Sequence, residues 1–273
     1  MASLKGRLLA VGDIHGHLRH LELLMELVSP SVDDKVVFIG DYVDRGPDSK
    51  GVIGYLIKFG KRFPSTVFLR GNHEQMFLDA LSSYSRIHSL DGPKFTRLRD
   101  TSRRARYEIG FDAEDDWKIF MGNGGHATLQ SYGAIEGSHG NYQVDFEKIP
   151  QEHLDFINVT RLYHDETVEV VTDKGIEKKE FLFVHAGIAK GVELEKQDPY
   201  DMLWIRDSFL CSNSDFGGKI IVHGHTPGNV PTKAPHRICV DSGVYMCRSG
   251  SKYSDGMGML TCCNVVTREI WQS

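Results

Sequence analysis

The sequence has no excess of positive charge, no paired cysteine motif and no long hydrophobic run. Its 273 residues carry a formal net charge of −5. Because a protein that binds a nucleic-acid backbone needs clustered Lys and Arg, this balance argues against a nucleic-acid polymer as partner. The five cysteines include no CxxC pair, so we interpret them as reduced thiols in a reducing compartment.

The sequence also lacks a membrane segment and a secretion signal. No window approaches the roughly 18 consecutive apolar residues that a membrane span requires. Residues 1–13 lead into a strand-like segment without the apolar region of a signal peptide. These absences predict a cytoplasmic protein with no membrane partner.

The chain contains no internal repeat, low-complexity tract or linker. Its content of 40% hydrophobic and 25% charged residues is typical of a globular protein. The length suits one large α/β domain, so we predict a single domain over residues 1–273. Hydrophobic periodicity weakens in residues 82–125, where we predict an inserted helical cap.

The first third of the chain repeats one pattern three times: a short apolar strand, a loop and a helix. The predicted strands cover 7–11, 35–39 and 66–69, and the predicted helices cover 17–28, 49–59 and 74–81. Consecutive units of this kind predict a parallel sheet flanked by helices, with the loops at the carboxyl edge of the sheet. We expect the three loops to face one crevice.

The carboxyl-terminal half is richer in predicted strands. The pattern predicts a helix at 151–159, a hairpin of 167–172 and 178–184 around an Asp-Lys-Gly turn, strands at 219–222 and 237–240, and a closing hairpin within 258–271. The two halves together predict an α/β fold.

Three short motifs occupy the loops of the first three units. They read GDIHG at 12–16, GDYVDRG at 40–46 and GNHE at 71–74, and each directly follows an apolar strand. Asp13 and His15 lie two residues apart, so an extended backbone directs both side chains to the same side. A mixture of carboxylate, imidazole and amide ligands suits divalent ions such as manganese, iron or zinc.

In combination, these motifs resemble the metallophosphoesterase signature of the phosphoprotein phosphatase family, in particular its bacterial and phage branch. Three blocks in this order, each at a strand end, rarely arise by chance. The further matching segments are FVHAG around His185, LWIRD around Arg206, VHGHTP around His225 and VDSG at 240–243. The resemblance implies a sandwich of mixed β-sheets flanked by helices, with the active site at the carboxyl ends of the strands.

The resemblance implies a centre of two divalent cations, with manganese favoured and iron or zinc as alternatives. One cation would be bound by Asp13, His15 and Asp41, and the other by Asp41, Asn72, His185 and His225, so that Asp41 bridges them. Two cations that share a carboxylate lower the pKa of a shared water. The resulting hydroxide would attack phosphorus in line with the leaving oxygen.

The resemblance also assigns residues to phosphate binding and proton transfer. His73 would protonate the leaving oxygen, and Asp44 would orient it, since a carboxylate partner favours a protonated imidazole. Arg45, Asn72 and Arg206 would bind the phosphate. Guanidinium groups suit this role because their planar donors meet phosphate oxygens in pairs.

Three functions compete for this site. The leading hypothesis is a serine/threonine protein phosphatase acting on phosphorylated proteins or peptides, with small phosphate esters as further substrates. The alternative is a diadenosine tetraphosphate hydrolase, because the GHTP and W-x-R features also occur in that branch. A catalytically inactive binding module is disfavoured, since every proposed ligand, the proposed acid and both arginines are present.

The match to the animal and plant enzymes of the family is incomplete. Their Ser-Ala-Pro-Asn-Tyr loop is replaced at 240–245 by Val-Asp-Ser-Gly-Val-Tyr. The inhibitor sensitivity and regulatory subunits of those enzymes therefore cannot be transferred to this chain.

Several other polar residues have an ordinary structural explanation. Asp48 and Glu74 are each predicted to favour the first turn of a helix. His223 is predicted to have an ordinary surface or core role, with contact to substrate or metal as the alternative. Asp241 either supports the metal site or caps a turn. The arginine cluster at 97–106 is either a solvated helix face or a basic rim that attracts phosphorylated substrate.

Overall fold

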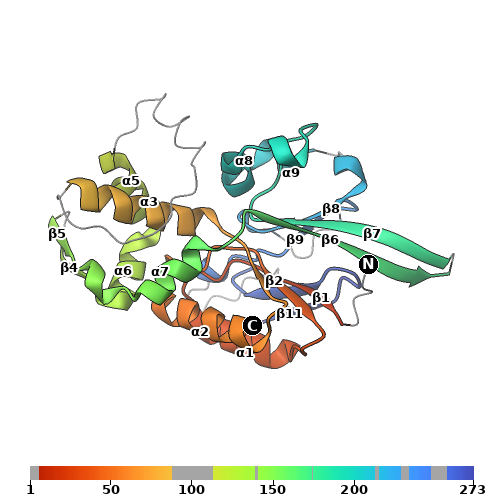
Figure 1. Cartoon of the computed structure of the whole chain (residues 1–273), viewed down its shortest axis with the longest axis horizontal. Helices are drawn as coiled ribbons and strands as arrows, with labels where there is room; N and C mark the ends of the chain where they lie inside the picture. Colours follow the sequence, from red (N-terminus) through yellow and green to blue (C-terminus); the bar gives the residue numbers. More distant parts are fainter. Residues whose placement is uncertain are drawn as a thin grey trace.

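The computed structural model describes residues 6–87, 113–138, 141–173, 175–212, 215–228, 234–246 and 257–273. Within them, two large β-sheets pack face to face, and helices cover the outer face of each (Figure 1). This arrangement confirms the predicted α/β sandwich of mixed sheets. None of the helices in these ranges is long and apolar enough to cross a membrane.

The first sheet carries the three predicted strand–loop–helix units. Its order is β11-β10-β1-β2-β3, and its strands are β1 (Leu8–Val11), β2 (Lys35–Phe38), β3 (Val67–Phe68), β10 (Thr261–Asn264) and β11 (Ile270–Gln272). β1, β2 and β3 are parallel, as predicted, whereas β10 runs antiparallel to β1. The closing hairpin therefore joins the sheet formed by the amino-terminal part of the chain.

Three helices cover the outer face of this sheet. They are α1 (Leu18–Val28), α2 (Ser49–Arg62) and α7 (Gln151–Asn158). Leu24 of α1 and Ile53 of α2 are fully buried in one apolar cluster with Phe38 of β2. Asp48 caps α2 as predicted, because its side chain accepts the backbone N–H of Gly51 at 2.7 Å.

The second sheet packs on the inner face of the first. Its order is β6-β7-β8-β9, with β6 (Tyr163–Thr172), β7 (Gly175–Val184), β8 (Ile220–His223) and β9 (Arg237–Cys239). Side chains alternate between the two faces of a strand. Phe183 of β7 therefore packs with Val37 of the first sheet, while Leu182 packs with Met202 and Phe209 of the covering helices α8 (Pro199–Trp204) and α9 (Asp207–Leu210).

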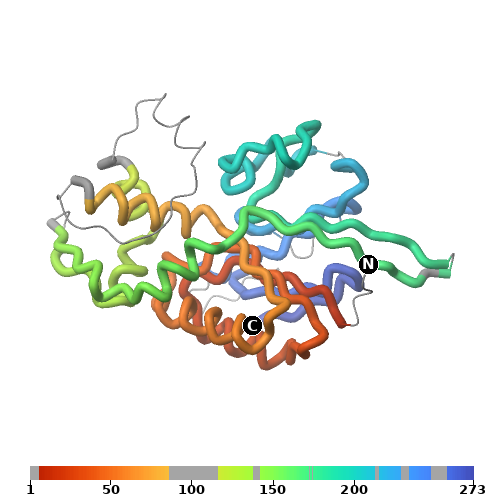
Figure 2. Tube along the Cα trace, viewed as in Figure 1, coloured from red at the N-terminus to blue at the C-terminus, as the bar shows by residue number. Residues whose placement is uncertain are grey.

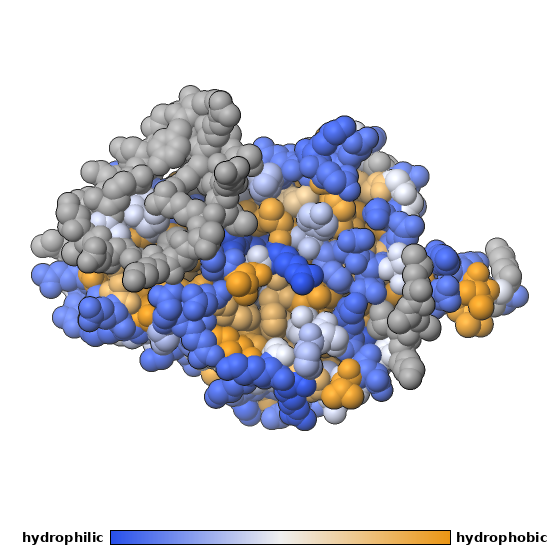
Figure 3. All heavy atoms as spheres, viewed as in Figure 1, coloured by the Kyte–Doolittle hydropathy of each residue, from blue (hydrophilic) through white to orange (hydrophobic). Residues whose placement is uncertain are grey.

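The hairpin of β6 and β7 is longer than predicted. The two strands pair from Tyr163 with Val184 to Thr172 with Gly175, so each begins earlier in the sequence than expected. The outer part of the hairpin projects from the body (Figure 2), and residues 175–180 of β7 are exposed or only partly buried. Val171 and Ile176, which lie next to the turn of the hairpin, are exposed, and Figure 3 shows apolar atoms at its projecting end.

A helical unit extends from the end of β3. It comprises α3 (Asn72–Ile87), α5 (Ala113–Phe120), a kinked turn (Met121–Gly125) and α6 (His126–Tyr132), and the hairpin of β4 (Ile135–Ser138) and β5 (Asn141–Val144) follows it. α3 continues past its predicted end at 81. The hydroxyl of Ser83 is buried there and donates to Asp116 of α5 at 2.8 Å, which is why the apolar periodicity weakens. The arginine cluster at 97–106 lies outside the described residues.

Short 3-10 turns complete the secondary structure of the described ranges, at Phe146–Lys148, Leu194–Lys196, Phe216–Gly218 and Val244–Met246. The last of them follows β9 and brings Tyr245 to the same edge of the sandwich as the loops of the three motifs, where its ring lies 5.1 Å from that of His15.

Candidate metal centre

The polar motifs meet at the carboxyl edge of the two sheets. Asp13 follows β1, Asp41 follows β2, and Asn72 begins α3 directly after β3. His185 and His225 come from the second sheet, where they follow β7 and β8. All five side chains are buried, so both sheets contribute to one polar cluster within the protein.

Backbone carbonyls orient two of the imidazoles. Nδ1 of His15 lies 2.9 Å from the carbonyl of Val43, and Nδ1 of His185 lies 3.0 Å from the carbonyl of Ile39. Because a carbonyl only accepts, each Nδ1 carries a proton and each Nε2 is left to bind a cation. The Nε2 atoms face different oxygens of Asp41, at 3.5 Å from Oδ2 for His15 and 3.3 Å from Oδ1 for His185. This arrangement fits two cations that share Asp41.

Asn72 and His225 lie on the His185 side of Asp41. Oδ1 of Asn72 lies 2.9 Å from Nε2 of His185 and 2.9 Å from Nδ1 of His225. The second ring nitrogen of His225, Nε2, is buried and has no hydrogen-bond partner within the described ranges. Ligand atoms of Asp41, His185 and His225 lie within 4.8 Å of one another, close enough for one ion.

The opposite side of Asp41 has a second group of this kind, formed by His15, Asp41 and His73, again with ligand atoms within 4.8 Å of one another. Asp13 belongs to neither group. Its carboxylate instead accepts the backbone N–H of His225, with Oδ2 at 3.1 Å. The structure thus places four of the six predicted metal ligands in the two groups, the Asn72 oxygen 2.9 Å from two of their imidazole nitrogens, and Asp13 beside the His225 backbone.

The carboxylates of the cluster repel one another. Burial, together with the charges of Asp241 and Asp41, raises the pKa of Asp13 well above its usual value. Burial also raises the pKa of Asp241 to about 6. Asp41 behaves differently: burial favours its neutral form, but the imidazole of His185 and its neighbours hold its pKa well below the usual range. A cation would stabilise the ionised form of each carboxylate.

The imidazoles are held mostly in the neutral form that binds metals. Burial lowers the pKa of His225 to about 2 and the pKa of His15 well below its usual value. For His185, burial acts in the same direction, but the charge of Asp41 prevails and raises the pKa. A cation between His185 and Asp41 would replace the proton that this pair favours.

Five non-glycine residues of the centre have a left-handed backbone. Their φ angles are 45° for His15, 53° for Asp41, 70° for Asp44, 68° for Arg45 and 66° for His225. Such conformations cost about 1–3 kcal/mol each and persist only where the surroundings enforce them. The loops that carry the motifs are therefore held by contacts that the motifs themselves do not reveal.

Glu74 lies in the first turn of α3, as predicted, and also provides one of these contacts. Its carboxylate is fully buried. Oε2 accepts the backbone N–H groups of Asp41 at 2.8 Å and Gly71 at 2.9 Å, and Oε1 accepts those of Tyr42 at 2.7 Å and Val43 at 3.2 Å. Glu74 thus fixes the loop that presents Asp41, through contacts that local sequence reasoning could not find.

His73, a member of the second group, forms a buried pair with Asp44. Nδ1 of His73 lies 2.7 Å from Oδ2 of Asp44. The guanidinium of Arg45 reaches Nε2 of His73 at 3.0 Å and Nε2 of His15 at 3.0 Å. It also lies over the ring of Tyr245, 4.1 Å from its centroid, a cation–π contact that the sequence did not predict.

Arg206 lies at the exposed rim of the centre. Its Nη1 donates to the hydroxyl of Thr226 at 2.9 Å and lies 3.5 Å from the carbonyl of His225. Arg206 and Arg45 therefore approach the cluster from different elements, Arg206 from the segment after α8 and Arg45 from the loop after β2.

His223 and Asp241, for each of which the sequence left two roles open, lie in different surroundings. His223 is in the core, with its ring edge-on to Phe209 and outside both metal-ligand groups. Asp241 caps a turn, because its Oδ1 accepts the N–H of Gly243 at 2.8 Å. Its Oδ2 is nevertheless buried with no hydrogen-bond partner in the described part of the chain. The charge of Asp241 also helps to raise the pKa of Asp13.

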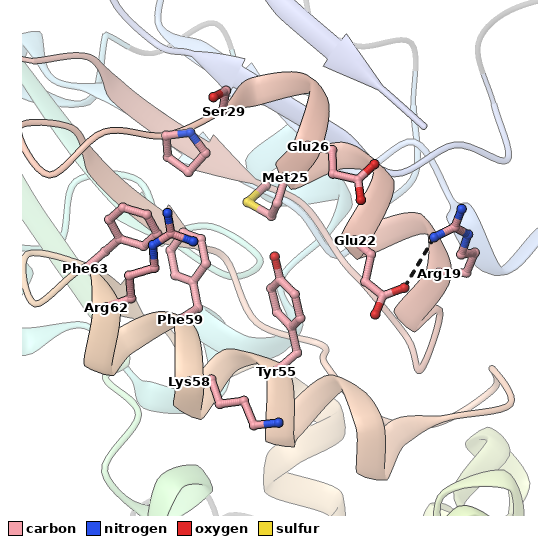
Figure 4. Close-up of a pocket in the computed structure, with 11 residues that line it drawn as sticks. Arg19, Glu22, Met25, Glu26, Ser29, Tyr55, Lys58, Phe59, Arg62 and Phe63 are labelled. Atoms are coloured by element: carbon pink, nitrogen blue, oxygen red, sulfur yellow. Dashed lines mark ion pairs between the residues drawn. The ribbon is translucent and has the colours of Figure 1, made fainter.

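A separate groove of about 610 Å³ lies between α1 and α2 (Figure 4). Met25, Phe59 and Phe63 contribute its apolar lining, and an ion pair of 3.6 Å between Arg19 and Glu22 lies at its edge. None of the predicted site residues lines this groove. The chemistry is therefore assigned to the buried polar cluster.

Comparison with known families agrees with this geometry. The family model of the calcineurin-like phosphoesterases matches residues 6–149, more than half of the chain, and this range contains all three motifs. The chain belongs to the calcineurin-like phosphoesterase family. Members of this family use divalent metal ions, and the two buried groups that share Asp41 fit such ions.

Curated relatives of this calcineurin-like phosphoesterase include serine/threonine phosphatases. The chain is 44% identical over 91 residues to serine/threonine-protein phosphatase 1 of Salmonella typhimurium, covering 32% of this chain and 40% of the relative. It is 43% identical over 65 residues to serine/threonine-protein phosphatase PP2A-like PPG1 of Saccharomyces cerevisiae, covering 23% of this chain and 18% of the relative. The matched part thus spans less than half the length of these relatives.

A solved structure shares the fold over the entire chain. It is provisionally named a diadenosine tetraphosphatase, and it is 17% identical in sequence with a TM-score of 0.57, covering 100% of this chain and 95% of that one. This likeness supports the calcineurin-like phosphoesterase fold alone.

Proposed function

We propose that this calcineurin-like phosphoesterase is a metal-dependent serine/threonine protein phosphatase. The observation that carries the proposal is the position of Asp41, whose two oxygens face Nε2 of His15 and Nε2 of His185 separately. A carboxylate in this position suits a pair of divalent cations. The mixed ligand set favours manganese, with iron or zinc as alternatives.

The proposal assigns the ligands as follows. Asp13, His15 and Asp41 would hold one ion, and Asp41, Asn72, His185 and His225 would hold the other. When bound, two such ions neutralise phosphate charge and lower the pKa of a coordinated water. The buried, mutually repelling carboxylates of Asp13 and Asp241 support this assignment, because a cation would offset their repulsion.

The side chains of the protein would bind the phosphate and supply a proton. Arg45, Asn72 and Arg206 would contact phosphate oxygens. His73 would donate from Nε2 to the leaving oxygen, since Nδ1 is occupied by Asp44 at 2.7 Å. General acid catalysis of this kind contributes about 10²–10⁴-fold.

The substrate proposed is phosphoserine or phosphothreonine in a protein or peptide, with residues 1–273 forming one catalytic domain that carries a helical insertion at 82–125. The names of the relatives that match at 44% and 43% identity support this substrate class. Diadenosine tetraphosphate is the alternative, because the GHTP and W-x-R segments at His225 and Arg206 resemble that branch as well.

A comparison of two substrates tests the proposal. The kcat/KM for a phosphothreonine peptide and for diadenosine tetraphosphate would be measured with the same concentration of manganese. We expect the peptide to be preferred by about tenfold or more, a difference of about 1.4 kcal/mol in transition-state stabilisation. A kcat/KM for the nucleotide that exceeds that for the peptide by about tenfold or more would overturn the substrate assignment. Asp41→Asn protein prepared in parallel should be inactive, and activity in that sample would point to a contaminating phosphatase.

A further inference from the structure

The helical unit returns to the reaction centre at two points that have no role in the mechanism above. Thr128 of α6 is fully buried, and its Oγ1 donates to Oδ1 of Asp44 at 2.6 Å and accepts the backbone N–H of Asp44 at 2.8 Å. In the kinked turn between α5 and α6, the carbonyl of Gly124 accepts the backbone N–H of Arg45 at 3.3 Å.

We propose that the helical unit is a positioning element for catalysis, in which Thr128 fixes the carboxylate of Asp44 and Gly124 fixes the backbone of Arg45. The inference rests on the proposed functions of His73 as proton donor and of Arg45 as phosphate ligand. It assigns Thr128 and Gly124 to positioning, because the Thr128 hydroxyl is fully buried against Asp44 and Gly124 has no side chain.

The backbone of the loop explains why such an element is needed. Asp44 and Arg45 are consecutive non-glycine residues with φ angles of 70° and 68°. This conformation is sterically disfavoured, so contacts from outside the loop must hold it. Besides Thr128, the loop receives a contact from Ser49, whose Oγ accepts the N–H of Asp44 at 3.1 Å.

Thr128 holds Asp44 at both its backbone and its side chain. With Oδ1 bonded to Thr128, the other oxygen, Oδ2, is directed at Nδ1 of His73, 2.7 Å away. Rotation of the carboxylate would break one of these two hydrogen bonds. The threonine hydroxyl therefore sets the orientation of the imidazole through the aspartate.

The helical unit thereby contributes one member of the His73–Asp44 pair and contacts the other. α3 carries His73 in its first turn, and α6 brings Thr128 back to Asp44. The separation of His73 from Asp44 thus depends on the positions of α3 and α6.

Gly124 approaches the loop more closely than another residue could. Its φ angle is 101°, and an added Cβ would lie 2.8 Å from the backbone nitrogen of Arg45 and 2.9 Å from its Cγ. Gly122, two residues earlier, has no atom within 4 Å of an added Cβ. Alanine should therefore displace Arg45 when placed at 124 and leave it undisturbed when placed at 122.

The first experiment compares Thr128→Val, Thr128→Ser and Ser83→Ala on two aryl phosphates with manganese. Phenyl phosphate has a basic leaving group that needs protonation, whereas p-nitrophenyl phosphate has a weakly basic one. Thr128→Val should lower kcat on phenyl phosphate by about tenfold or more, lower it less on p-nitrophenyl phosphate, and leave KM unchanged. Thr128→Ser, which keeps the hydroxyl, should restore kcat.

Ser83→Ala is the matched control for stability. It also removes a buried hydroxyl that donates to an aspartate within the helical unit, but it does not contact Asp44. Its ratio of kcat values on the two esters should equal that of the wild type. A Thr128→Val protein that loses activity equally on both esters would have only a structural defect, and the positioning proposal would be wrong.

The second experiment compares Gly124→Ala with Gly122→Ala. Gly124→Ala should raise KM for both esters and weaken inhibition by inorganic phosphate, each by about tenfold, because Arg45 is displaced. Gly122→Ala should match the wild type. Equal behaviour of the two alanine variants would contradict the function given to Gly124.

The outcomes separate this inference from the proposed function. Wild-type protein that hydrolyses both esters, combined with a Thr128→Val variant of unchanged kcat, would overturn the positioning proposal and leave the phosphatase proposal intact. Wild-type protein that hydrolyses neither ester would overturn the phosphatase proposal, and this inference with it.

Discussion

Nδ1 of His73 lies 2.7 Å from Oδ2 of Asp44, and both side chains are excluded from solvent. The other ring nitrogen, Nε2, faces the guanidinium of Arg45 at 3.0 Å and Oδ2 of Asp41 at 3.8 Å. The imidazole thus has one nitrogen held by a carboxylate and one beside the candidate metal ligands. This relationship allows proton transfer to be tested separately from metal binding.

We expect His73→Asn to lower kcat on phenyl phosphate by about 10²–10⁴-fold while the protein keeps its full metal content. The substitution removes the proton donor but leaves Asp41, His185 and His225 in place. Turnover would be measured with manganese, and bound metal by mass spectrometry after gel filtration. Full activity of this variant would remove His73 from its assigned role, as would a loss of activity that only follows a loss of metal.

Metal binding should depend on Asp41 more than on any other ligand. Because Asp41 faces both His15 and His185, Asp41→Asn should lose both ions, whereas Asp13→Asn should lose one of them. Manganese at about 1,000 times its Kd should stabilise the wild type by about 4 kcal/mol per site. Thermal unfolding with and without manganese, together with metal analysis, checks this. An Asp41→Asn protein that still binds two equivalents would contradict the shared carboxylate.

Glu74→Gln should destabilise the protein by about 2–4 kcal/mol and reduce its manganese content. The carboxylate accepts backbone N–H groups from four residues, and a glutamine amide would direct its own N–H donors at some of them. Urea unfolding measures the loss. Glu22→Gln, on the outer surface of α1, is the matched control and should leave stability unchanged. Equal stability of the two variants would mean that the Glu74 carboxylate is not needed to hold the loop.

Asp34 should make the stability of the protein depend on pH below about 4. Burial alone would raise its pKa, but hydrogen bonds from the Arg7 side chain and from the N–H groups of Ser31 and Arg7 lower it to about 2. A depressed pKa gives stability that is present above the unfolded value of 3.8 and is lost as the pH falls through about 2.

We therefore expect Asp34→Asn to cost about 2 kcal/mol at pH 7, and the difference from the wild type to close between pH 4 and about pH 2. Urea unfolding at several pH values measures this difference. Glu152→Gln disrupts the exposed ion pair with Lys61 and should show no such dependence. A difference between Asp34→Asn and wild type that stays constant down to pH 2 would contradict the assignment.

The elements near the first three motifs could be predicted because their signals are local. Apolar runs such as residues 35–39 end at a glycine and are followed by amphipathic segments, and β2 and α2 form where these patterns lie. The placement of β10 beside β1 could not be predicted, because the paired residues Ala10 and Cys263 are separated by most of the sequence. A short apolar strand specifies its burial but not its partner.

The sequence by itself determined the candidate ligands, because its Asp, His and Asn residues lie in glycine-rich motifs at strand ends whose order resembles the metallophosphoesterase signature. Only the tertiary structure decided how those loops are held: Glu74 beneath Asp41, Thr128 against Asp44 and Tyr245 under Arg45. The physical reason is that a left-handed loop is stabilised by hydrogen bonds and ring contacts from distant elements. Such partners become neighbours only when the two sheets and the helical unit have packed together.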